Sequence, residues 1–213
     1  MSSAASDVYK RQDVYHVNLC EKLLVLSLSK ICNYVPGSGI WLNTQRPEWN
    51  DANNALVGNG TSMVTVYYLK RFLEFFRKLI LKIEATDIKI SHEVFSWFTE
   101  VEAEVSNTLS INHTNCSDKD RMDFVSKLGT IFENYRRNVY RSGFSTRKIK
   151  IPLKKLENFL SDILIKLNET ILCNRNSDGL FNAYNTININ NEHQSIDVKR
   201  LDLMLEGQVA GLS

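Results

Sequence analysis

The sequence lacks an excess of charge of either sign, because its 26 lysine and arginine residues are nearly matched by 24 aspartate and glutamate residues. Proteins that bind nucleic acid through its phosphates usually carry a clear positive excess, so a net charge of +2 does not favour a nucleic-acid partner. Hydrophobic residues make up 43% of the 213 residues, which is enough to form a sizeable core. The composition therefore excludes disorder over most of the chain.

Cysteine pairs are also missing from the sequence. The four cysteines, Cys20, Cys32, Cys116 and Cys173, form no C-x-x-C pair and no zinc-ligand pattern with the four histidines. We expect reduced thiols, and we expect neither a bound metal nor an organic cofactor.

No apolar stretch has the length and purity of a membrane-spanning segment. The longest one, residues 63–83, is interrupted by the charged residues Lys70, Arg71, Glu74, Arg77 and Lys78. The start of the chain shows no apolar core of a secretory signal. We therefore expect no membrane partner and a cytoplasmic location.

Both ends of the chain have unusual sequences. Residues 1–12 include the string SSAASDVYKRQ, which is typical of a sequencing or assembly artefact rather than of natural protein. The segment from Leu201 to Ser213 stops within an amphipathic pattern that has no cap. We expect residues 13–213 to be a fragment of one helical catalytic-type domain, which needs the rest of its own full-length chain and is inactive alone.

Apolar residues recur at helical spacing through most of the chain. The pattern predicts helices near residues 18–34, 61–83, 91–105, 117–140 and 152–171, and another from residue 198. Thr61 or Ser62, Ser91 and Ser117 stand where N-caps are expected. Apolar residues cover most of the circumference of the helix at 61–83, which is typical of a helix inside a larger assembly.

Two segments depart from helical spacing. Residues 36–60 contain four glycines and Pro47 among several asparagines, which predicts a long loop. Residues 180–189 alternate and are rich in tyrosine, threonine and isoleucine, which predicts at most a short extended segment. Five or six long helices with so little strand indicate a mainly α fold, either a bundle or a toroid of helical hairpins.

The segment from residue 41 to residue 54 concentrates the side chains that bind and cleave sugars. Its aromatic, basic, acidic and amide members are Trp41, Trp49, Arg46, Glu48, Asp51, Asn50 and Asn53. An indole ring stacks on the apolar face of a pyranose, while amide and guanidinium groups bind its hydroxyls. A carboxylic acid protonates the leaving oxygen of a glycosidic bond. The segment therefore predicts a carbohydrate site.

The string Glu48-Trp49-Asn50-Asp51-Ala52-Asn53 resembles the G-D-W-N-D-G-[ML]-N loop of the cellobiose and chitobiose phosphorylases, in the six-hairpin glycosidase superfamily. The resemblance implies that Asp51 is the general acid and that Trp49 lines the sugar site. It also implies an (α/α)6 barrel, of which this chain would supply about half. The match covers under ten residues. Pro47-Glu48 stands where the family has Gly-Asp, and Ala52 where it has Gly. The stretch 46–58 is also similar to segments of large uncharacterised bacterial proteins of this type.

The resemblance leaves the reaction open between a glycoside hydrolase and an inverting phosphorylase. An inverting hydrolase needs a second carboxylate as base, whereas in a phosphorylase the phosphate attacks directly. Glu48 is too close to Asp51 in sequence to be a clear base, and Glu206 is a partner only if the fold brings it near. Phosphate would require cationic and hydroxyl donors, expected from the missing part of the protein.

A non-catalytic role is the alternative. Asp51 can cap a short helix, Trp41 and Trp49 can anchor a loop on the core, and Arg46 and Glu48 can pair across a turn. The chain is then a helical protein-interaction module that binds through apolar surfaces. A basic cluster at the end of the fourth helical pattern and beyond it is interpreted as a solvated helix end and loop: Arg136, Arg137, Arg141, Arg147, Lys148, Lys150, Lys154 and Lys155.

Overall fold

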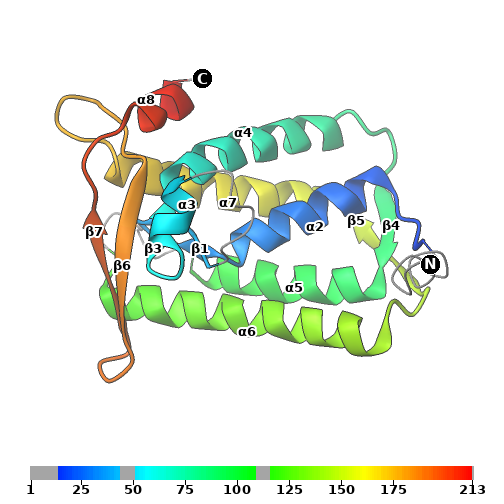
Figure 1. Ribbon diagram of the computed structural model, residues 1–213. Coiled ribbons are helices and arrows are strands. Elements are labelled where there is room, and N and C mark those ends of the chain that lie inside the picture. The colour runs from blue at the N-terminus through cyan, green and yellow to red at the C-terminus, as the bar shows by residue number, and fades with distance from the viewer. Residues whose placement is uncertain (1–13, 44–50, 109–115, 213) are drawn as a thin grey trace, which may run out of the picture.

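The computed structural model describes residues 14–43, 51–108 and 116–212, with the backbone alone for Asn53. Its helices are α2 (Leu19–Ile31), α3 (Asp51–Leu56), α4 (Met63–Ile80), α5 (His92–Asn107), α6 (Asp118–Ser142), α7 (Leu153–Cys173) and α8 (Leu205–Leu212). Its strands are β1 (Tyr34–Val35), β2 (Gly39–Trp41), β3 (Gly60–Ser62), β4 (Asp87–Ser91), β5 (Lys148–Pro152), β6 (Tyr184–Asn190) and β7 (Ser195–Arg200). Figure 1 shows the long helices lying side by side, with a sheet at each end of the bundle.

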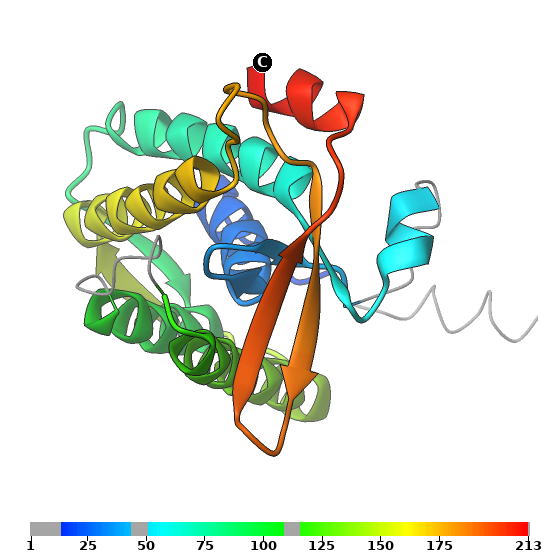
Figure 2. The same ribbon diagram turned by 90° about the vertical axis from the view of Figure 1, so that its left-hand side faces the viewer.

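The long helices form two packed pairs with α2 between them. Helix α4 packs on α7, α5 packs on α6, and α2 contacts both α4 and α5 (Figures 1 and 2). Apolar side chains that are almost fully buried fill the space between the helices; they include Leu24, Leu28, Leu73, Phe76, Trp97, Phe98, Phe159 and Leu160. Burial of each such side chain contributes roughly 1.5–3 kcal/mol, so these faces are the main source of stability.

Two of the predicted caps hold the starts of long helices. Ser62 and Ser117 each accept a hydrogen bond from a backbone N–H of the first turn, at 3.0 and 3.1 Å. Asn18, which was not predicted as a cap, does the same for α2 at 2.8 Å. Ser91 precedes α5 without such a bond. The predicted helices near 18–34, 61–83, 91–105, 117–140 and 152–171 are thus confirmed. None of the described helices is long and apolar enough to cross a membrane.

A five-stranded antiparallel sheet closes one end of the bundle, in the order β1-β2-β3-β6-β7. Strands β6 and β7 form a hairpin that lies against α6 and faces the viewer in Figure 2. The turn between β1 and β2 contains Gly37 at φ 71°. Gly39 has φ 138°, and a Cβ there would lie 2.9 Å from the carbonyl oxygen of Ser62. Only glycine fits at that position, because β2 and β3 approach so closely.

A second, two-stranded antiparallel sheet lies at the opposite end of the bundle. It pairs β4 with β5, and Ile88 faces Ile151 while Ile90 faces Ile149. Ile90 and Ile151 are fully buried. The sheet therefore joins the start of α5 to the start of α7 through a small apolar face.

The predicted mainly α fold, a partial (α/α)6 toroid of helical hairpins, is wrong. The two sheets make the fold mixed α and β. The predicted loop at 36–60 contains β2 and α3 and leads into β3. The helix predicted from residue 198 begins only at Leu205, as α8, because residues 198–200 end β7. The extended segment at 180–189 is confirmed as β6, within a sheet. Strands β1 to β3 have only two or three residues each, too few to show alternation.

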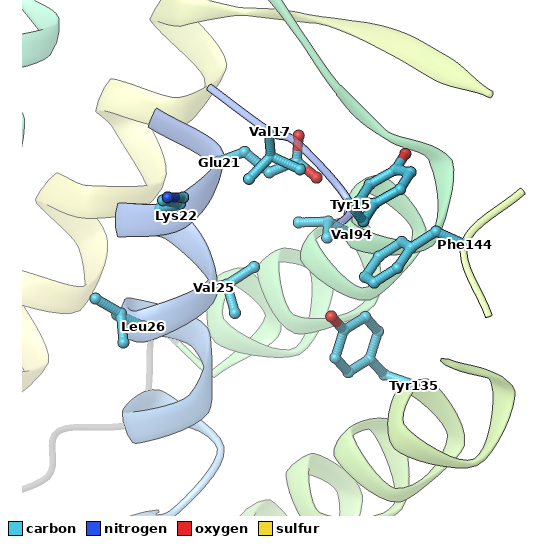
Figure 3. A pocket seen from close by; sticks show the side chains of 9 residues that line it. All are labelled: Tyr15, Val17, Glu21, Lys22, Val25, Leu26, Val94, Tyr135 and Phe144. Atoms are coloured by element: carbon cyan, nitrogen blue, oxygen red, sulfur yellow. The ribbon is translucent and has the colours of Figure 1, made fainter. Parts of the chain in front are cut away.

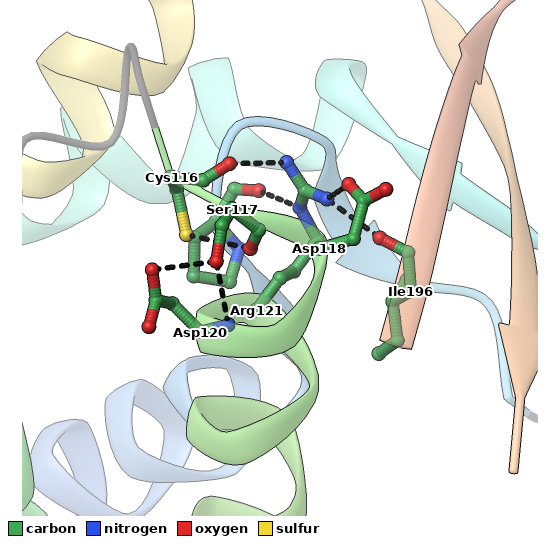
Figure 4. Close-up of polar contacts among 7 residues, drawn as sticks. Cys116, Ser117, Asp118, Asp120, Arg121 and Ile196 are labelled. Atoms are coloured by element: carbon green, nitrogen blue, oxygen red, sulfur yellow. Dashed lines mark hydrogen bonds and ion pairs between the residues drawn. The ribbon is translucent and has the colours of Figure 1, made fainter. Parts of the chain in front are cut away.

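Arg121 ties α6 to the main sheet (Figure 4). Arg121 is 8% exposed. The guanidinium donates through Nε to the carbonyl oxygen of Pro36 at 2.9 Å, and through Nη1 to that of Ile196 at 2.6 Å. It also pairs with Asp118 at 2.6 Å and donates to the Cys116 carbonyl at 3.2 Å. These bonds offset the desolvation of a buried charge and fix both the β1–β2 turn and β7 on α6.

A buried cluster of asparagines also holds the β1–β2 turn in place. Asn185 donates to the Ser38 carbonyl at 2.6 Å and to Asn174 Oδ1 at 2.8 Å. Asn182 donates to Asn185 Oδ1 at 2.6 Å, and Asn174 donates to the Gly37 carbonyl at 2.9 Å. The cluster joins the β1–β2 turn to the end of α7 and to β6, so segments far apart in sequence are positioned together.

Candidate functional site

Most of the predicted sugar site lies outside the described residues. Its members there are Arg46, Glu48, Trp49 and Asn50. The described members are Asp51, which begins α3 with an exposed side chain, Trp41, which is half-buried at the end of β2, and the backbone of Asn53 within α3.

Trp41 and Asp51 lie near opposite ends of α3: Asp51 begins the helix, and the indole of Trp41 contacts the turn that follows it. Trp41 Nε1 donates to the carbonyl oxygen of Gly58, just after the helix, at 3.0 Å. Asp51 is the first residue of this six-residue helix, which rises about 9 Å along its axis. The hydrogen bond fixes the indole of Trp41 against the turn that leads into β3.

Glu206, considered as a second carboxylate, lies in α8. It accepts a hydrogen bond from the hydroxyl of Tyr184 at 2.8 Å. Helices α8 and α3 lie apart in both views of the fold (Figures 1 and 2). The described residues therefore do not bring Glu206 to Asp51, and acid chemistry at Asp51 stays a prediction.

A cavity of about 390 Å³ lies between α2, α5 and α6 and reaches the surface beside the exposed Lys22 and Leu26 (Figure 3). The residues that line it are Tyr15, Val17, Glu21, Lys22, Val25, Leu26, Val94, Tyr135 and Phe144. Most of them are aliphatic or aromatic. A cavity of this size with apolar walls and a few polar groups is typical of sites for small molecules.

Stacked aromatic rings form the walls of the cavity. Tyr15 and Phe144 are parallel, with ring centroids 4.5 Å apart. Tyr135 stacks on Trp97 at 4.1 Å, and Trp97 is 2% exposed. Because stacking partners restrict each ring, the walls are set before a ligand arrives.

Glu21 is among the residues that line the cavity, but its carboxylate is buried behind the wall. The residue is 1% exposed, and its side chain points from α2 toward Tyr15 in Figure 3. Oε2 lies 3.4 Å from Lys148 Nζ, whereas Oε1 is buried without a hydrogen-bond partner among the described residues. A buried acceptor without a partner costs roughly 1–3 kcal/mol.

Lys148 connects the polar groups behind the aromatic wall. Its Nζ donates to Ser91 Oγ at 2.8 Å and lies 4.6 Å from the centre of the Tyr15 ring. Tyr15 and Ser91 also share a hydrogen bond of 3.1 Å. This use of the Ser91 hydroxyl accounts for the missing N-cap bond of α5.

A serine beside a lysine is also the geometry of Ser–Lys hydrolases, in which a neutral lysine activates the serine. Burial alone would lower the pKa of Lys148, but Tyr15 and the carboxylate of Glu21 together raise it above its ordinary value. Lys148 is therefore a cation at neutral pH, and Ser91 is fully buried. The pair acts as a structural clamp rather than as a base and nucleophile.

The hydroxyl of Tyr135 is the second polar group of the cavity. It points toward α2 in Figure 3, and no hydrogen bond joins it to another described residue. Burial, followed by the charges of Glu21 and Glu93, raises the pKa of Tyr135 to about 12. The phenol is therefore neutral at physiological pH, and its oxygen can both donate and accept a hydrogen bond.

This cavity was not predicted from the sequence, although the position of Glu21 was one sign of it. Glu21 stands three and seven residues before Leu24 and Leu28, so its carboxylate falls on the buried stripe of α2. A carboxylate on such a stripe indicates a specific polar role. Lys148 was interpreted as solvated, but its side chain is only 30% exposed and pairs with Glu21.

No family model matches the chain, and no curated protein matches it significantly. The two sheets overturn the expected six-hairpin α/α barrel. The glycosidase-like and phosphorylase-like activity stays a prediction, which no family match supports. Within the described ranges, no group of three or more His, Cys, Asp or Glu side chains is placed to hold a metal ion.

Proposed function

We propose that this protein is a non-catalytic binding module that takes up a small apolar ligand in the cavity between α2, α5 and α6. The observation that carries the proposal is a preformed cavity of about 390 Å³ with stacked aromatic walls. The proposal keeps the non-catalytic alternative from the sequence but replaces an all-helical surface for a protein partner with a defined cavity.

The expected affinity follows from the apolar area that a ligand buries. A ligand of about eight non-hydrogen atoms that buries roughly 200 Å² gains about 5 kcal/mol. This free energy corresponds to a Kd of roughly 0.2 mM before further ordering costs are included. Simple aromatic probes at millimolar concentration are therefore sufficient to test the cavity.

The test is a titration of the whole 213-residue chain with ethylbenzene, followed by NMR chemical shifts of the backbone amides. We expect saturable shifts that centre on Val25, Val94 and Phe144. The variant Val25→Phe narrows the cavity from α2, and we expect it to weaken binding about tenfold or more. The matched control is Leu172→Phe, because Leu172 is 65% exposed on α7 and does not line the cavity.

Two results would contradict the proposal. One is the absence of saturable shifts at the cavity up to the solubility limit of ethylbenzene. The other is an affinity that Val25→Phe leaves equal to that of the control variant while both proteins remain folded.

A further inference from the structure

We infer that the ligand of this cavity is an anionic amphiphile, with an apolar body inside the cavity and a carboxylate at the mouth beside Lys22. The inference rests on the proposed function, because it names the ligand class of the same cavity. It concerns the charged end of the ligand, which stays in contact with water, whereas the proposed function concerns the apolar part.

The interior of the cavity is unsuited to a charged group. Its walls are apolar side chains such as Val25 and Val94, together with the phenol of Tyr135 (Figure 3). The carboxylate of Glu21 is buried behind the wall and paired with Lys148 at 3.4 Å. A charged group inside would exchange its hydration shell for apolar contacts and one phenol, which is unfavourable. A charge on the ligand therefore belongs at the mouth, where water reaches it.

Lys22 places a cation at that mouth. It is an exposed residue of α2 and lines the cavity together with Leu26, which is 57% exposed and lies one turn further along the helix (Figure 3). A lysine in this setting packs its aliphatic stem on apolar neighbours and keeps its ammonium in water. The long side chain can therefore bring its ammonium to a group that emerges from the cavity.

The charges at the mouth favour an anion. Lys22 forms no ion pair with another residue in the described part of the chain. Glu21, the other charged residue of the lining, is buried and already paired with Lys148. Glu93 lines the neighbouring cleft between α5 and α6, where its Oε1 accepts a hydrogen bond from the backbone of Ser145. A ligand carboxylate at the mouth gains a partner in Lys22, whereas a ligand ammonium there meets a like charge.

The preference for an anion is expected to be modest, because an ion pair in water contributes little. Exposed pairs of lysine and carboxylate change an affinity by about two- to fivefold. Dissolved salt screens such a pair, since the Debye length falls from about 10 Å at 0.1 M to about 3 Å at 1 M ionic strength. The preference should therefore be clear at low ionic strength and mostly lost in concentrated salt.

The experiment compares three probes that share one carbon skeleton on the whole chain: 3-phenylpropionate, 3-phenylpropan-1-ol and 3-phenylpropylamine. NMR titration at neutral pH and low ionic strength measures the Kd of each probe. We expect the carboxylate to bind about two- to fivefold more tightly than the alcohol, and the amine to bind more weakly than the alcohol. Addition of NaCl to about 1 M is expected to bring the three Kd values together.

Two variants of Lys22 locate the carboxylate. Lys22→Gln removes the charge, so the ratio of the affinities for the carboxylate and the alcohol is expected to fall to about one. Lys22→Glu reverses the charge and is expected to make the amine bind more tightly than the carboxylate. The matched control is Lys30→Gln, because Lys30 is exposed on the same helix and does not line the cavity. The backbone amide spectrum of each variant checks that it is folded.

The outcomes separate the inference from the proposed function. Tighter binding of the carboxylate that Lys22→Gln removes and Lys30→Gln keeps supports the inference. Equal affinities for the carboxylate and the alcohol overturn it but leave the apolar cavity as a binding site. The same holds for tighter binding of the amine by the wild type, or for a preference that Lys22→Glu does not change. Binding of neither these probes nor ethylbenzene overturns both proposals.

Discussion

At the scale of single residues, Arg121 and Asn185 stand out because each is a polar group buried in the sheet end of the molecule. Arg121 donates to carbonyls of the β1–β2 turn and of β7, and Asn185 donates to the same turn and to the end of α7. A buried polar group is favourable only while its partners are in place. Each residue is therefore a test of how the sheet is held on the helices.

Replacement of Arg121 by Met is expected to lower the free energy of unfolding by about 3 kcal/mol, because it leaves the carbonyls of Pro36 and Ile196 without their donor. The measurement is urea denaturation followed by circular dichroism. The control is Arg137→Met on the same helix, where an exposed pair with Glu133 contributes less than about 0.5 kcal/mol. Equal effects of the two variants would show that the buried contacts of Arg121 are unimportant.

Replacement of Asn185 by Ala is expected to cost about 2–4 kcal/mol, since Asn182, Asn174 and the Ser38 carbonyl each lose one of their buried hydrogen bonds. Asn188→Ala, at an exposed position of the same strand, is the control and is expected to change the free energy of unfolding by less than about 0.5 kcal/mol. Thermal and urea unfolding of the two variants measure the difference. A loss below about 1 kcal/mol for Asn185→Ala would argue against a satisfied buried network.

At the scale of elements, close packing of α8 on the segment before β6 depends on small residues. A Cβ at Gly207 would lie 2.7 Å from the carbonyl oxygen of Phe181, and the amide of Gln208 both donates to and accepts from the Phe181 backbone. In contrast, a Cβ at Gly129 in α6 would meet nothing within 4 Å. The two glycines therefore have different roles in their helices.

Gly129→Ala is expected to raise the free energy of unfolding by about 0.5–1 kcal/mol, because alanine restricts the unfolded chain and suits a helix interior. Gly207→Ala is expected to lower it by about 1–3 kcal/mol, because the helix must move away from Phe181. Melting temperatures of the two variants give the sign of each effect. A stabilising Gly207→Ala would mean that α8 does not pack as described.

Some elements of the fold could be predicted from the sequence, and others could not. Helices such as α6 and α7 were predictable because their apolar residues recur over many turns and Ser117 forms a recognisable cap. Strands β4 and β5 carried alternation in Ile88, Ile90, Ile149 and Ile151, but five residues each between strong helical patterns were easily taken as loops. The residues of β1 to β3 owe their strand conformation to distant partners, which local sequence does not encode.

The candidate site was less predictable than the fold, because its lining comes from three separate segments. Residues 15–26, Val94 and residues 135–144 lie far apart in sequence and meet only after α2, α5 and α6 pack. Sequence reasoning favoured the residues 41–54, where suggestive side chains are adjacent in the chain. A cluster of suggestive side chains in one short segment is visible in the sequence, whereas a site that tertiary contacts assemble is not.

At the scale of the whole molecule, acid is expected to weaken the contact between α5 and the segment that follows α6. Burial alone would raise the pKa of Glu93, but hydrogen bonds from Ser145 and the nearby His92 outweigh it and lower the pKa below its ordinary value of 4.5. A lowered carboxyl pKa stabilises the fold above about pH 4.5, and this part is lost as the pH falls through the value in the folded protein.

The melting temperature between about pH 6 and pH 3 measures this effect. In the variant Glu93→Gln, we expect a smaller decrease of the melting temperature over this range than in the wild type, because the titrating group is gone. The control Glu133→Gln changes an exposed carboxylate on α6 and is expected to leave the decrease unchanged. An identical pH dependence of Glu93→Gln and the wild type would contradict the assignment.

The central claim is that the cavity between α2, α5 and α6 binds a small apolar ligand. The most direct test is the set of NMR contacts between ethylbenzene and assigned side chains of the whole chain. The account predicts contacts from the ring of the ligand to the methyl groups of Val25 and Val94. Contacts located instead at the exposed apolar residues of α8, such as Leu205 and Leu212, would contradict it.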